Sequence, residues 1–299
     1  MDLSIIIPSY NTQALLRQCL KSLMSNVKSQ MLNVEIIVID NGSTDGSAQM
    51  IEKEFPGVKL IKNPKNFGFA KAVNQGLEKA SGRYLLLLNS DTVIQDGAID
   101  KMVAFLENHL EVGVVGCQLK NPDGTIQPSG GYLANLVNVF WWMTFLDDLP
   151  IIRKIFPAYH VMDKDFYKKQ RYLGWVTGAF FLTKREVFEK VGFFDEKMFM
   201  YVEEVDWCAW AKRAGYKVAF NPSACVIHFK GASTKRGKAG ILEEYQGLKY
   251  FFKKHKPSWQ TPILRIILKL GALARIFVFG IILKDLEAKR IYAKAYQSA

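Results

Sequence analysis

The sequence predicts an α/β protein with a mostly parallel sheet flanked by helices. Short runs rich in isoleucine and valine alternate with segments of helical periodicity through the first half of the chain, the pattern of repeated βα units. With 299 residues, 49% of them hydrophobic, the chain can bury a large core. We therefore expect one large domain, residues 1–232, followed by a helical extension, residues 233–299.

The predicted elements follow from periodicity and punctuation. Five apolar runs read as strands, at 3–7, 35–40, 58–61, 84–88 and 112–117. Helical spacing predicts helices across 15–23, after Ser43 or Thr44, and over 69–80 and 98–110. After a turn at 121–124 we expect a strand over 173–182, a helix over 203–214 and short strands near Val218 and Val226.

The net charge of +12 is a property of the last quarter of the chain. Residues 1–229 hold 25 Lys and Arg against 24 Asp and Glu, whereas residues 230–299 hold 15 against 4. This basic tail lacks a nucleic-acid reading motif and runs into an apolar segment, which argues against a nucleic-acid binder. The start of the chain does not have the form of a signal peptide, and the four cysteines form no CxxC pair, so we expect a cytoplasmic protein with reduced thiols.

The tail contains an apolar segment, 263–283, with the length of a membrane span but interrupted by Arg265, Lys269 and Arg275. On a helical wheel the three charges fall within about 120° of arc. We expect an amphipathic helix that lies peripherally on the anionic inner face of the cell membrane, with Trp141 and Trp142 as a second contact. The alternative is a helix that packs on the domain's own apolar surface or in a homodimer.

Polar residues end the predicted parallel strands, where open α/β sheets bind ligands. Asn89-Ser90-Asp91 follows a buried strand, and its amide and carboxylate can reach one Mg²⁺ or Mn²⁺ ion. Asp40 and Asp45 bracket a Gly-Ser-Thr loop suited to a ribose and a base edge. The alternative interpretations are a turn for the first motif and helix capping for the second.

Further along, Glu203, Glu204 and Asp206 lie at the start of a predicted helix among aromatic residues. A carboxylate there could take the proton of an attacking hydroxyl, although acids also favour helix N-termini for electrostatic reasons. His228 ends a short predicted strand and is either a metal ligand or a buried core histidine.

Taken in order, these residues resemble family 2 of the nucleotide-sugar glycosyltransferases, which has the Rossmann-like GT-A fold. The resemblance covers about residues 3–233 and rests on the blocks SIIIPSYN, VIDNGSTDGS, NFGFAKAVNQG, YLLLLNSDT, WVTGAFFL, GFFDEKMFMYVEEVDW and VIHFKGAS. Within that family Asn89-Ser90-Asp91 stands at the metal-binding DxD motif. The asparagine in the first position is similar to a branch of rhamnosyltransferases that act on lipid-linked or polysaccharide acceptors.

The resemblance implies a role for each site residue. For the donor nucleotide sugar it implies Pro8, Tyr10, Asn11, Asp40, Asn41, Asn66, Gly68, Lys71, Asn74, Asn89 and Ser90. For the metal it implies Asp91, Asn89 and His228, and for the acceptor Trp175, Gly178, Asp206 and Trp207. The catalytic acids would be Glu204 as base, with Glu203 and Asp206 beside it; Asp206 could instead organise the helix.

These residues predict an inverting, metal-dependent glycosyltransferase of cell-envelope glycan synthesis, using dTDP-rhamnose or a UDP-sugar. A diphosphate leaving group and one base suit a single displacement, and no second carboxylate stands out as a nucleophile for retention. Two alternatives are a nucleotide-sugar-binding module without turnover and a sugar-phosphate nucleotidyltransferase. The second would need a glycine-rich phosphate loop, which the N-terminal block does not offer.

Overall fold

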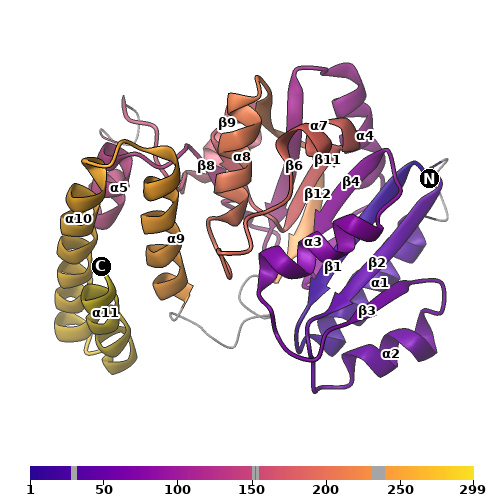
Figure 1. Ribbon diagram of the computed structural model, residues 1–299, viewed down its shortest axis with the longest axis horizontal. Coiled ribbons are helices and arrows are strands. Elements are labelled where there is room, and N and C mark those ends of the chain that lie inside the picture. The colour runs from indigo at the N-terminus through magenta and orange to yellow at the C-terminus, as the bar shows by residue number, and fades with distance from the viewer. Residues whose placement is uncertain (28–31, 150–151, 153–154, 230–239) are drawn as a thin grey trace.

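The computed structural model describes residues 1–27, 32–149, 152, 155–229 and 240–299. A twisted sheet with helices on both faces occupies one side of the molecule, and a layer of helices from the C-terminal part occupies the other (Figure 1). The helix α8 (Glu203–Arg213) lies between the sheet and the helix α9 (Gly240–His255). The mixed α/β fold class predicted from the sequence is confirmed.

The main sheet has the strand order β3-β2-β1-β4-β11-β6-β12-β5, with β7 beside β6 and β9 beside β12. Its strands are β1 (Leu3–Ser9), β2 (Val34–Asp40), β3 (Lys59–Lys62), β4 (Tyr84–Leu88), β5 (Thr92–Ile94), β6 (Val112–Lys120), β7 (Ile126–Gln127), β9 (Arg171–Leu173), β11 (Phe180–Lys184) and β12 (Lys217–His228). Strands β1 to β4 are parallel, whereas β11 runs antiparallel between β4 and β6. A separate antiparallel pair joins β8 (Gly130–Gly131) to β10 (Trp175–Val176).

Both faces of the parallel strands are buried, which explains their continuous apolar runs. Along β1, Ile5 and Ile7 point into one core, whereas Ile6 points into the other. The first core lies under the helices α1 (Gln13–Val27), α2 (Ser47–Glu54) and α4 (Ala98–Asn108), and the second under α3 (Phe69–Lys79), α7 (Arg185–Val191) and α8. The helices thus cover the sheet on both sides.

The structure differs from the sequence prediction at two strands. The predicted strand 173–182 is divided into β9, β10 and β11, because the backbone of Gly174 approaches that of Tyr132 and Leu133 too closely for a side chain and leaves the sheet there. The two short strands expected near Val218 and Val226 are one strand, β12, whose register shifts between Asn221 and Cys225. Pro222, which cannot donate to a ladder, lies inside this shift and made the strand look interrupted.

The helical layer consists of α5 (Leu136–Met143), α9, α10 (Gln260–Arg275), a π-helical turn over Ile276–Ile282 and α11 (Leu286–Ser298). Helix α10 packs against α5, α9 and α11. The predicted boundary at 232/233 lies outside the described residues. Within the described part of the chain, no helix is both long and apolar enough to cross a membrane.

One of the three basic residues of the predicted tail helix does not face solvent as expected. Arg265 and Lys269 are exposed, but Arg275 is buried. Its guanidinium donates to the carbonyls of Met143 (2.7 Å) and Trp142 (2.9 Å) at the end of α5. Since a buried guanidinium needs acceptors, the last carbonyls of α5 stabilise it, and Arg275 joins α10 to α5 rather than facing solvent.

Candidate active site

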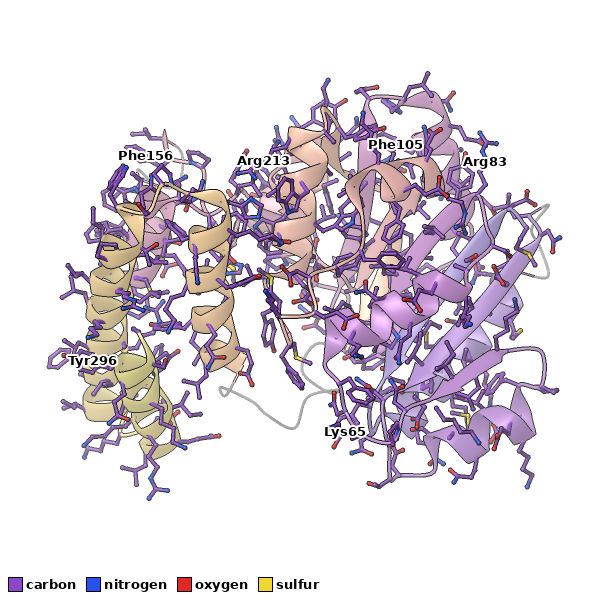
Figure 2. All side chains as sticks on the ribbon, viewed as in Figure 1. Lys65, Arg83, Phe105, Phe156, Arg213 and Tyr296 are labelled. Atoms are coloured by element: carbon purple, nitrogen blue, oxygen red, sulfur yellow. The ribbon has the colours of Figure 1, made fainter. Side chains whose placement is uncertain are left out.

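The predicted site residues gather at the edge of the sheet where the parallel strands end. Figure 2 marks the two edges: Arg83 immediately precedes β4, and Lys65 lies in the loop after β3 at the opposite edge. Arg213 marks the C-terminal end of α8, so the first turn of that helix points toward the same edge as Lys65. The helix start and the strand ends therefore face a common region.

Asp91 and His228 form a buried pair between β4 and the end of β12. Strand β12 is antiparallel to β5 with His228 opposite Thr92, and this register brings the imidazole Nε2 to 3.2 Å from Asp91 Oδ1. Asp91 is 1% exposed, and neither of its carboxylate oxygens accepts a hydrogen bond from the described residues. A buried carboxylate in this state calls for a cation.

The hydrogen bond at His228 Nδ1 determines whether the other ring nitrogen, Nε2, carries a hydrogen. His228 Nδ1 lies 2.7 Å from Gln127 Oε1, an oxygen that can only accept, so Nδ1 carries the hydrogen. In the neutral ring Nε2 then presents its lone pair toward Asp91, as a metal-ligating histidine does. Among the described residues no three His, Cys, Asp or Glu side chains converge as a metal cage. The carboxylate and the imidazole nitrogen are ligand types that a divalent cation accepts, and the pair would hold one only together with further ligands.

Asn89 and Ser90 connect this pair to the rest of the site. The Asn89 backbone NH donates to the carbonyl of Ala179 at 3.3 Å, and the Ser90 hydroxyl accepts from Thr12 at 3.0 Å. Next to Ala179, Gly178 faces the ring of Phe69, whose backbone NH donates to Phe199 at 2.7 Å. This chain of contacts joins the end of β4 to the loop that enters α8.

The loop after β2 has the geometry of a polar ligand pocket. Asp40 is buried, with Oδ2 accepting from the Ser43 backbone NH (3.2 Å) and Oδ1 free of hydrogen bonds from described residues. Asn11 has a left-handed backbone (φ 53°), and its side-chain oxygen accepts from the Thr44 NH at 2.8 Å. Tyr10 is 40% exposed beside them. Asp40 Oδ1 and Tyr10 are therefore available to a ligand, as predicted for the donor site, while Asn11 orders the loop.

Asn41 and Asn66 hold each other and the turn into α3. The Asn41 amide donates to Asn66 Oδ1 (2.9 Å) and to the Gly68 carbonyl (3.1 Å). Its side-chain oxygen accepts from Asn63 and from the backbone of Phe67. Gly68 is left-handed (φ 91°), and a β-carbon there would lie 2.6 Å from the Phe199 carbonyl. Hydrogen bonds of Asn41, Asn66 and Gly68, three of the residues predicted for the sugar-donor site, shape the loop. They use every hydrogen-bond donor and acceptor of the Asn41 side chain.

Two further predicted donor residues lie on α3. Asn74 is buried and forms a reciprocal pair with the Phe194 backbone, its amide donating at 2.9 Å and its oxygen accepting at 3.0 Å. Lys71 lies 3.4 Å from Glu196 and 5.2 Å from the centre of the Phe67 ring. Asn74 therefore fastens the loop before α8, whereas Lys71 is a partly exposed cation paired with Glu196.

The entry to α8 has an unusual backbone. Tyr201 and Val202 both have left-handed conformations, with φ of 67° and 70°. This is costly for a tyrosine and more so for a β-branched valine, and such residues concentrate at functional sites. The turn directs the next two side chains, Glu203 and Glu204, out of the helix start.

Glu203 and Glu204 are acids that the fold leaves without partners. Glu203 is 4% exposed, and the Oε2 atoms of both residues are buried without a hydrogen bond from any described residue. Burial raises the pKa of Glu204 to about 7, with a further contribution from the charge of Glu244 on α9. Burial and the adjacent Glu204 raise the pKa of Glu203 well above its usual range. A carboxyl with a pKa near 7 is suited to act as a base at neutral pH.

Asp206, one turn further, is in the opposite state. Its Oδ2 accepts from Lys254 at 2.8 Å and its Oδ1 lies 2.6 Å from His255 Nε2. Lys254 also forms an ion pair, at 2.8 Å, with Asp195 in the loop before α8. Both carboxylate oxygens of Asp206 thus bind residues of α9. This favours the alternative in which Asp206 organises the helix over the one in which it contacts the acceptor.

Three residues predicted for the acceptor have different surroundings. Trp207 is 1% exposed, stacks on Phe194 and donates its indole NH to Gly192, so it belongs to the core. Trp175 is also buried, with its indole NH donated to the Tyr159 carbonyl at 3.0 Å. Gly178 lies beside Phe69, between the end of β4 and the loop before α8. Of the three, Gly178 lies in the chain of contacts that joins the strand ends to the entry of α8.

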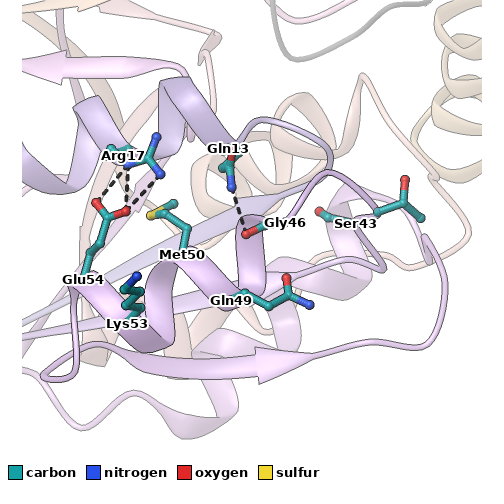
Figure 3. A pocket seen from close by; sticks show the side chains of 9 residues that line it. Gln13, Arg17, Ser43, Gly46, Gln49, Met50, Lys53 and Glu54 are labelled. Atoms are coloured by element: carbon teal, nitrogen blue, oxygen red, sulfur yellow. Dashed lines mark hydrogen bonds and ion pairs between the residues drawn. The ribbon is translucent and has the colours of Figure 1, made fainter.

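A pocket of about 420 Å³ lies between α1 and α2 (Figure 3). Arg17 and Glu54 form an ion pair on one side, and Gln13 donates to the Gly46 carbonyl on another. Ser43 and Thr44 on its rim belong to the loop that carries Asp40. The pocket contains neither Asp91 nor Glu204, so it lies outside the catalytic centre.

The family model that matches this chain is "Glycosyl transferase family 2", over residues 4–210. The chain belongs to this family. It is a glycosyltransferase, and the matched segment runs from β1 to the middle of α8 and so includes Asp40, Asp91 and Glu204. The predicted resemblance is confirmed.

Similar proteins include two named enzymes. An N-acetylglucosaminyl-diphospho-decaprenol L-rhamnosyltransferase of Mycobacterium tuberculosis is 28% identical over 77% of this chain and 78% of its own length. A dolichol-phosphate mannosyltransferase of Pyrococcus furiosus is 27% identical over 89% of this chain and 67% of its own length.

Solved structures share the fold. The mannosyltransferase PcManGT of Pyrobaculum calidifontis, in complex with GDP-Man and Mn²⁺, superimposes with a TM-score of 0.56 at 18% identity, over 99% of this chain and 85% of that one. TarS 1–349 of S. aureus gives a TM-score of 0.52 at 17% identity, over 99% and 91%.

Sequence reasoning missed two residues beside Glu204. Glu244 is one of only four acids in the basic stretch 230–299, and this anomaly was the one signal that could have drawn attention to it. His160 lies in a segment without a recognisable pattern, and only the fold brings it near α8.

Proposed function

We propose that the chain transfers a sugar, with inversion, from a nucleotide diphosphate donor to a hydroxyl of a lipid-linked or polysaccharide acceptor. The observation that carries the proposal is the presence of two carboxylate centres with buried oxygens that accept no hydrogen bond from described residues: Asp91, which lies beside His228, and the Glu203–Glu204 pair. The Asp91 centre is suited to bind a cation, and the Glu204 centre is suited to accept a proton. A transferase with a diphosphate leaving group needs both.

Asp91 and His228 Nε2 would hold Mg²⁺ or Mn²⁺, which supplies charge stabilisation for the departing diphosphate when bound. Asp40 Oδ1, buried at the end of β2 without a hydrogen bond from a described residue, would contact the nucleoside, as would the 40% exposed Tyr10 after β1. Asn41, Asn66 and Gly68 would keep this loop in shape. A structure that shares the fold, PcManGT, is a complex with GDP-Man and Mn²⁺, which supports the use of a divalent cation.

Glu204 would remove the proton from the attacking hydroxyl. Its pKa of about 7 leaves much of it ionised at neutral pH while keeping it basic enough to accept a proton. Attack from the face opposite the diphosphate inverts the anomeric centre in one step. Burial and the adjacent Glu204 raise the pKa of Glu203 well above its usual range, which favours the protonated form of Glu203 beside the base.

The relatives support a substrate class. The mycobacterial relative is named as a rhamnosyltransferase with an N-acetylglucosaminyl-diphospho-decaprenol acceptor, and an O-antigen biosynthesis protein of Myxococcus xanthus is 28% identical over 78% of this chain and 18% of its own length. We propose dTDP-rhamnose or a UDP-sugar as donor and a sugar on a polyprenyl diphosphate as acceptor, within cell-envelope glycan synthesis.

Donor hydrolysis tests the proposal without knowledge of the acceptor. We expect the protein with Mn²⁺ to release nucleotide diphosphate from its donor, and the release to stop in EDTA and in Asp91→Ala. Glu54→Gln, which alters an exposed ion pair in the pocket between α1 and α2, is the control and should hydrolyse normally. Full turnover in EDTA or in Asp91→Ala would refute the metal site, and no turnover by the wild-type protein with any of these donors would favour a binding module.

We further propose that α10 binds an anionic bilayer through the apolar side chains that it exposes. Leu264, Ile267 and Leu268 pack inside the protein. The outward stripe of α10 consists of large apolar side chains that are 40–60% exposed and recur at intervals of three or four: Trp259, Ile263, Ile266, Leu270, Leu273 and Phe277. Exposed Arg265 and Lys269 flank this stripe, as suits anionic headgroups.

Vesicle sedimentation tests the bilayer proposal. The full chain should sediment with vesicles containing phosphatidylglycerol, less so at high salt, and the double variant Ile266→Glu/Leu270→Glu should remain in the supernatant. Leu110→Glu, at an apolar residue after α4 that is even more exposed than Ile266 and Leu270, is the control and should sediment normally. Unchanged sedimentation of the double variant would refute the proposal, and a dimer in solution that dissociates in this variant without vesicle binding would assign the stripe to a homodimer.

A further inference from the structure

The C-terminal helical layer supplies two polar side chains that face Glu204. Glu244 lies on α9, and its charge raises the pKa of Glu204, whereas His160, from the loop after α5, acts in the opposite direction. His160 Nε2 and Glu244 Oε1 are 2.7 Å apart, and their side chains are 27% and 16% exposed. Two segments far apart in the chain thus meet as a hydrogen-bonded pair beside the unpartnered carboxyls of α8.

The His160 ring is set among aromatic rings on a rigid frame. Its centroid lies 4.9 Å from that of Trp142, 5.3 Å from Trp175 and 4.3 Å from Tyr159. Backbone bonds fasten the segment on both sides: Val161 NH donates to the Gly130 carbonyl at 3.1 Å, and the Tyr159 carbonyl accepts the Trp175 indole. Since a side chain on a fixed loop keeps its orientation, His160 has the precision that a ligand contact needs.

Helix α9 also holds the strained turn that presents Glu204. Gly247 on α9 faces Val202, and a β-carbon at this position would lie 2.7 Å from the valine Cγ2 and 3.1 Å from the Tyr201 carbonyl. The glycine lets α9 approach the two left-handed residues without a gap. Glu244 lies one turn earlier on the same helix, so the position of the His160–Glu244 pair relative to α8 is fixed by this contact.

The chemistry of this region suits a neutral, hydroxyl-rich ligand. A carboxylate accepts hydrogen bonds from sugar hydroxyls and a histidine N–H donates to them, so Glu204, Glu244 and His160 offer both kinds of partner. Glu203 is more than nine-tenths buried, and its Oε2 finds no partner in the described part of the chain. A buried unsatisfied oxygen next to aromatic rings indicates a place for a ligand hydroxyl.

We propose that His160 and Glu244 bind the acceptor sugar and direct its attacking hydroxyl to Glu204. This inference rests on the proposed transfer reaction and assigns its acceptor side to the helical layer. His160 and Glu244 would hydrogen-bond neighbouring hydroxyls of the sugar, and the attacking hydroxyl gives its proton to Glu204 as its oxygen bonds to the anomeric carbon. The C-terminal helices would then be part of the active site.

The test compares transfer with hydrolysis in the same variants. The probe acceptor is N-acetylglucosamine linked by a diphosphate to a short prenyl chain. In His160→Ala and Glu244→Gln we expect the KM for this acceptor to rise about ten- to a hundredfold, the factor expected for one lost charge-assisted hydrogen bond. The KM for the donor and hydrolysis without acceptor should change less than twofold, because water needs no positioning by the pair. His160→Gln, which keeps an N–H donor, should recover part of the loss.

Lys254→Met is the matched structural control. It removes the ion pairs from α9 to Asp206 on α8 and to Asp195 in the loop before it, at similar burial, and leaves the His160–Glu244 pair in place. We expect it to lower the unfolding temperature and leave the acceptor KM unchanged. Glu244→Gln should also shift the rise of transfer rate with pH to lower pH, since it removes a charge that faces Glu204 together with Glu203 and His160.

Three results would overturn the inference: an acceptor KM unchanged in His160→Ala, an equal rise in Lys254→Met, or a loss of hydrolysis as large as that of transfer. Failure of the wild-type protein to use this acceptor while it hydrolyses the donor would refute the proposed acceptor. A fall of hydrolysis in His160→Ala and Glu244→Gln would then still refute the assignment of the pair.

Discussion

Two buried glutamates at opposite ends of this protein have opposite pKa shifts. Glu35, near the start of β2, is desolvated, which raises its pKa, but hydrogen bonds from Lys59, Ser4 and Ser81 outweigh this and lower the pKa to about 2. Glu204, at the start of α8, is desolvated without such donors, and its pKa rises to about 7.

The comparison teaches that burial alone does not identify a functional acid. Glu35 is 5% exposed and its charge is fully compensated, as expected of an acid that stabilises a fold. Around Glu204 the fold provides neighbouring acids in place of donors, which costs stability. Asp206, on the same helix as Glu204, resembles Glu35 because Lys254 and His255 take both of its oxygens. The uncompensated acid is the one available for chemistry.

The largest expected effect is a loss of sugar transfer on substitution of Glu204, which substitution of Glu35 should not cause. Glu204→Gln should bind donor normally but lose transfer by about 10²-fold or more, since a positioned base contributes about that factor. With a pKa of about 7, the wild-type transfer rate should rise as pH increases through 7, where Glu204 becomes ionised. Both are measured as initial transfer rates at saturating donor from pH 5.5 to 9.

Glu203→Gln is the matched control for that variant, since it changes the adjacent acid of the same helix turn. Because burial and the adjacent Glu204 raise the pKa of Glu203 and favour its protonated form, its variant should keep a transfer rate within about tenfold of wild type. A crippled Glu203→Gln beside a nearly normal Glu204→Gln would reverse the two roles.

The next effect concerns stability at the other glutamate. Glu35→Gln should lower the free energy of unfolding by about 3 kcal/mol at pH 7, the equivalent of its pKa shift from 4.5 to about 2. The folded pKa is depressed, so this stabilisation is present above pH 4.5 and is lost as pH falls toward 2. Urea unfolding at pH 7 and pH 3 should show a difference between variant and wild type that shrinks at low pH. A constant difference would contradict the account.

The smallest effect is a gain of stability at Glu204. Its pKa is raised in the folded state, so its contribution is most favourable below pH 4.5 and is lost as pH rises through 7. Glu204→Gln removes the charge and should be more stable than wild type by at most about 3 kcal/mol at pH 8, the equivalent of the shift of its pKa from 4.5 to about 7, and about equal to it at pH 4.5. Destabilisation at pH 8 would mean that Glu204 has compensating partners.

The sequence predicts the parts of this molecule that depend on local pattern. Strands such as β4 are continuous apolar runs because both faces are buried, and the polar residues after them, Asp40 and Asp91, lie at the sheet edge because parallel strands end together. The resemblance to family 2, now confirmed, added an order to these motifs.

The rest depends on contacts between distant segments. Asp206 and Glu204 lie two residues apart and look equivalent in sequence, but only Asp206 meets Lys254 and His255 from α9. His160 reaches Glu204 because its loop is fastened to β8, which no periodicity indicates. Arg275 likewise looked like part of a polar face until α5 provided carbonyls to bury it. Partner identity, rather than residue type, decided each case.

The most direct test measures Glu204→Gln and Glu35→Gln together at pH 8, each for transfer rate per folded molecule and for unfolding temperature. The account predicts that the two results cross: Glu204→Gln loses transfer by about 10²-fold or more and unfolds at a higher temperature than wild type, whereas Glu35→Gln keeps its transfer rate and unfolds at a lower temperature. Loss of transfer and of thermal stability in both variants, or full transfer by Glu204→Gln, would contradict the assignment of Glu204 as the catalytic base.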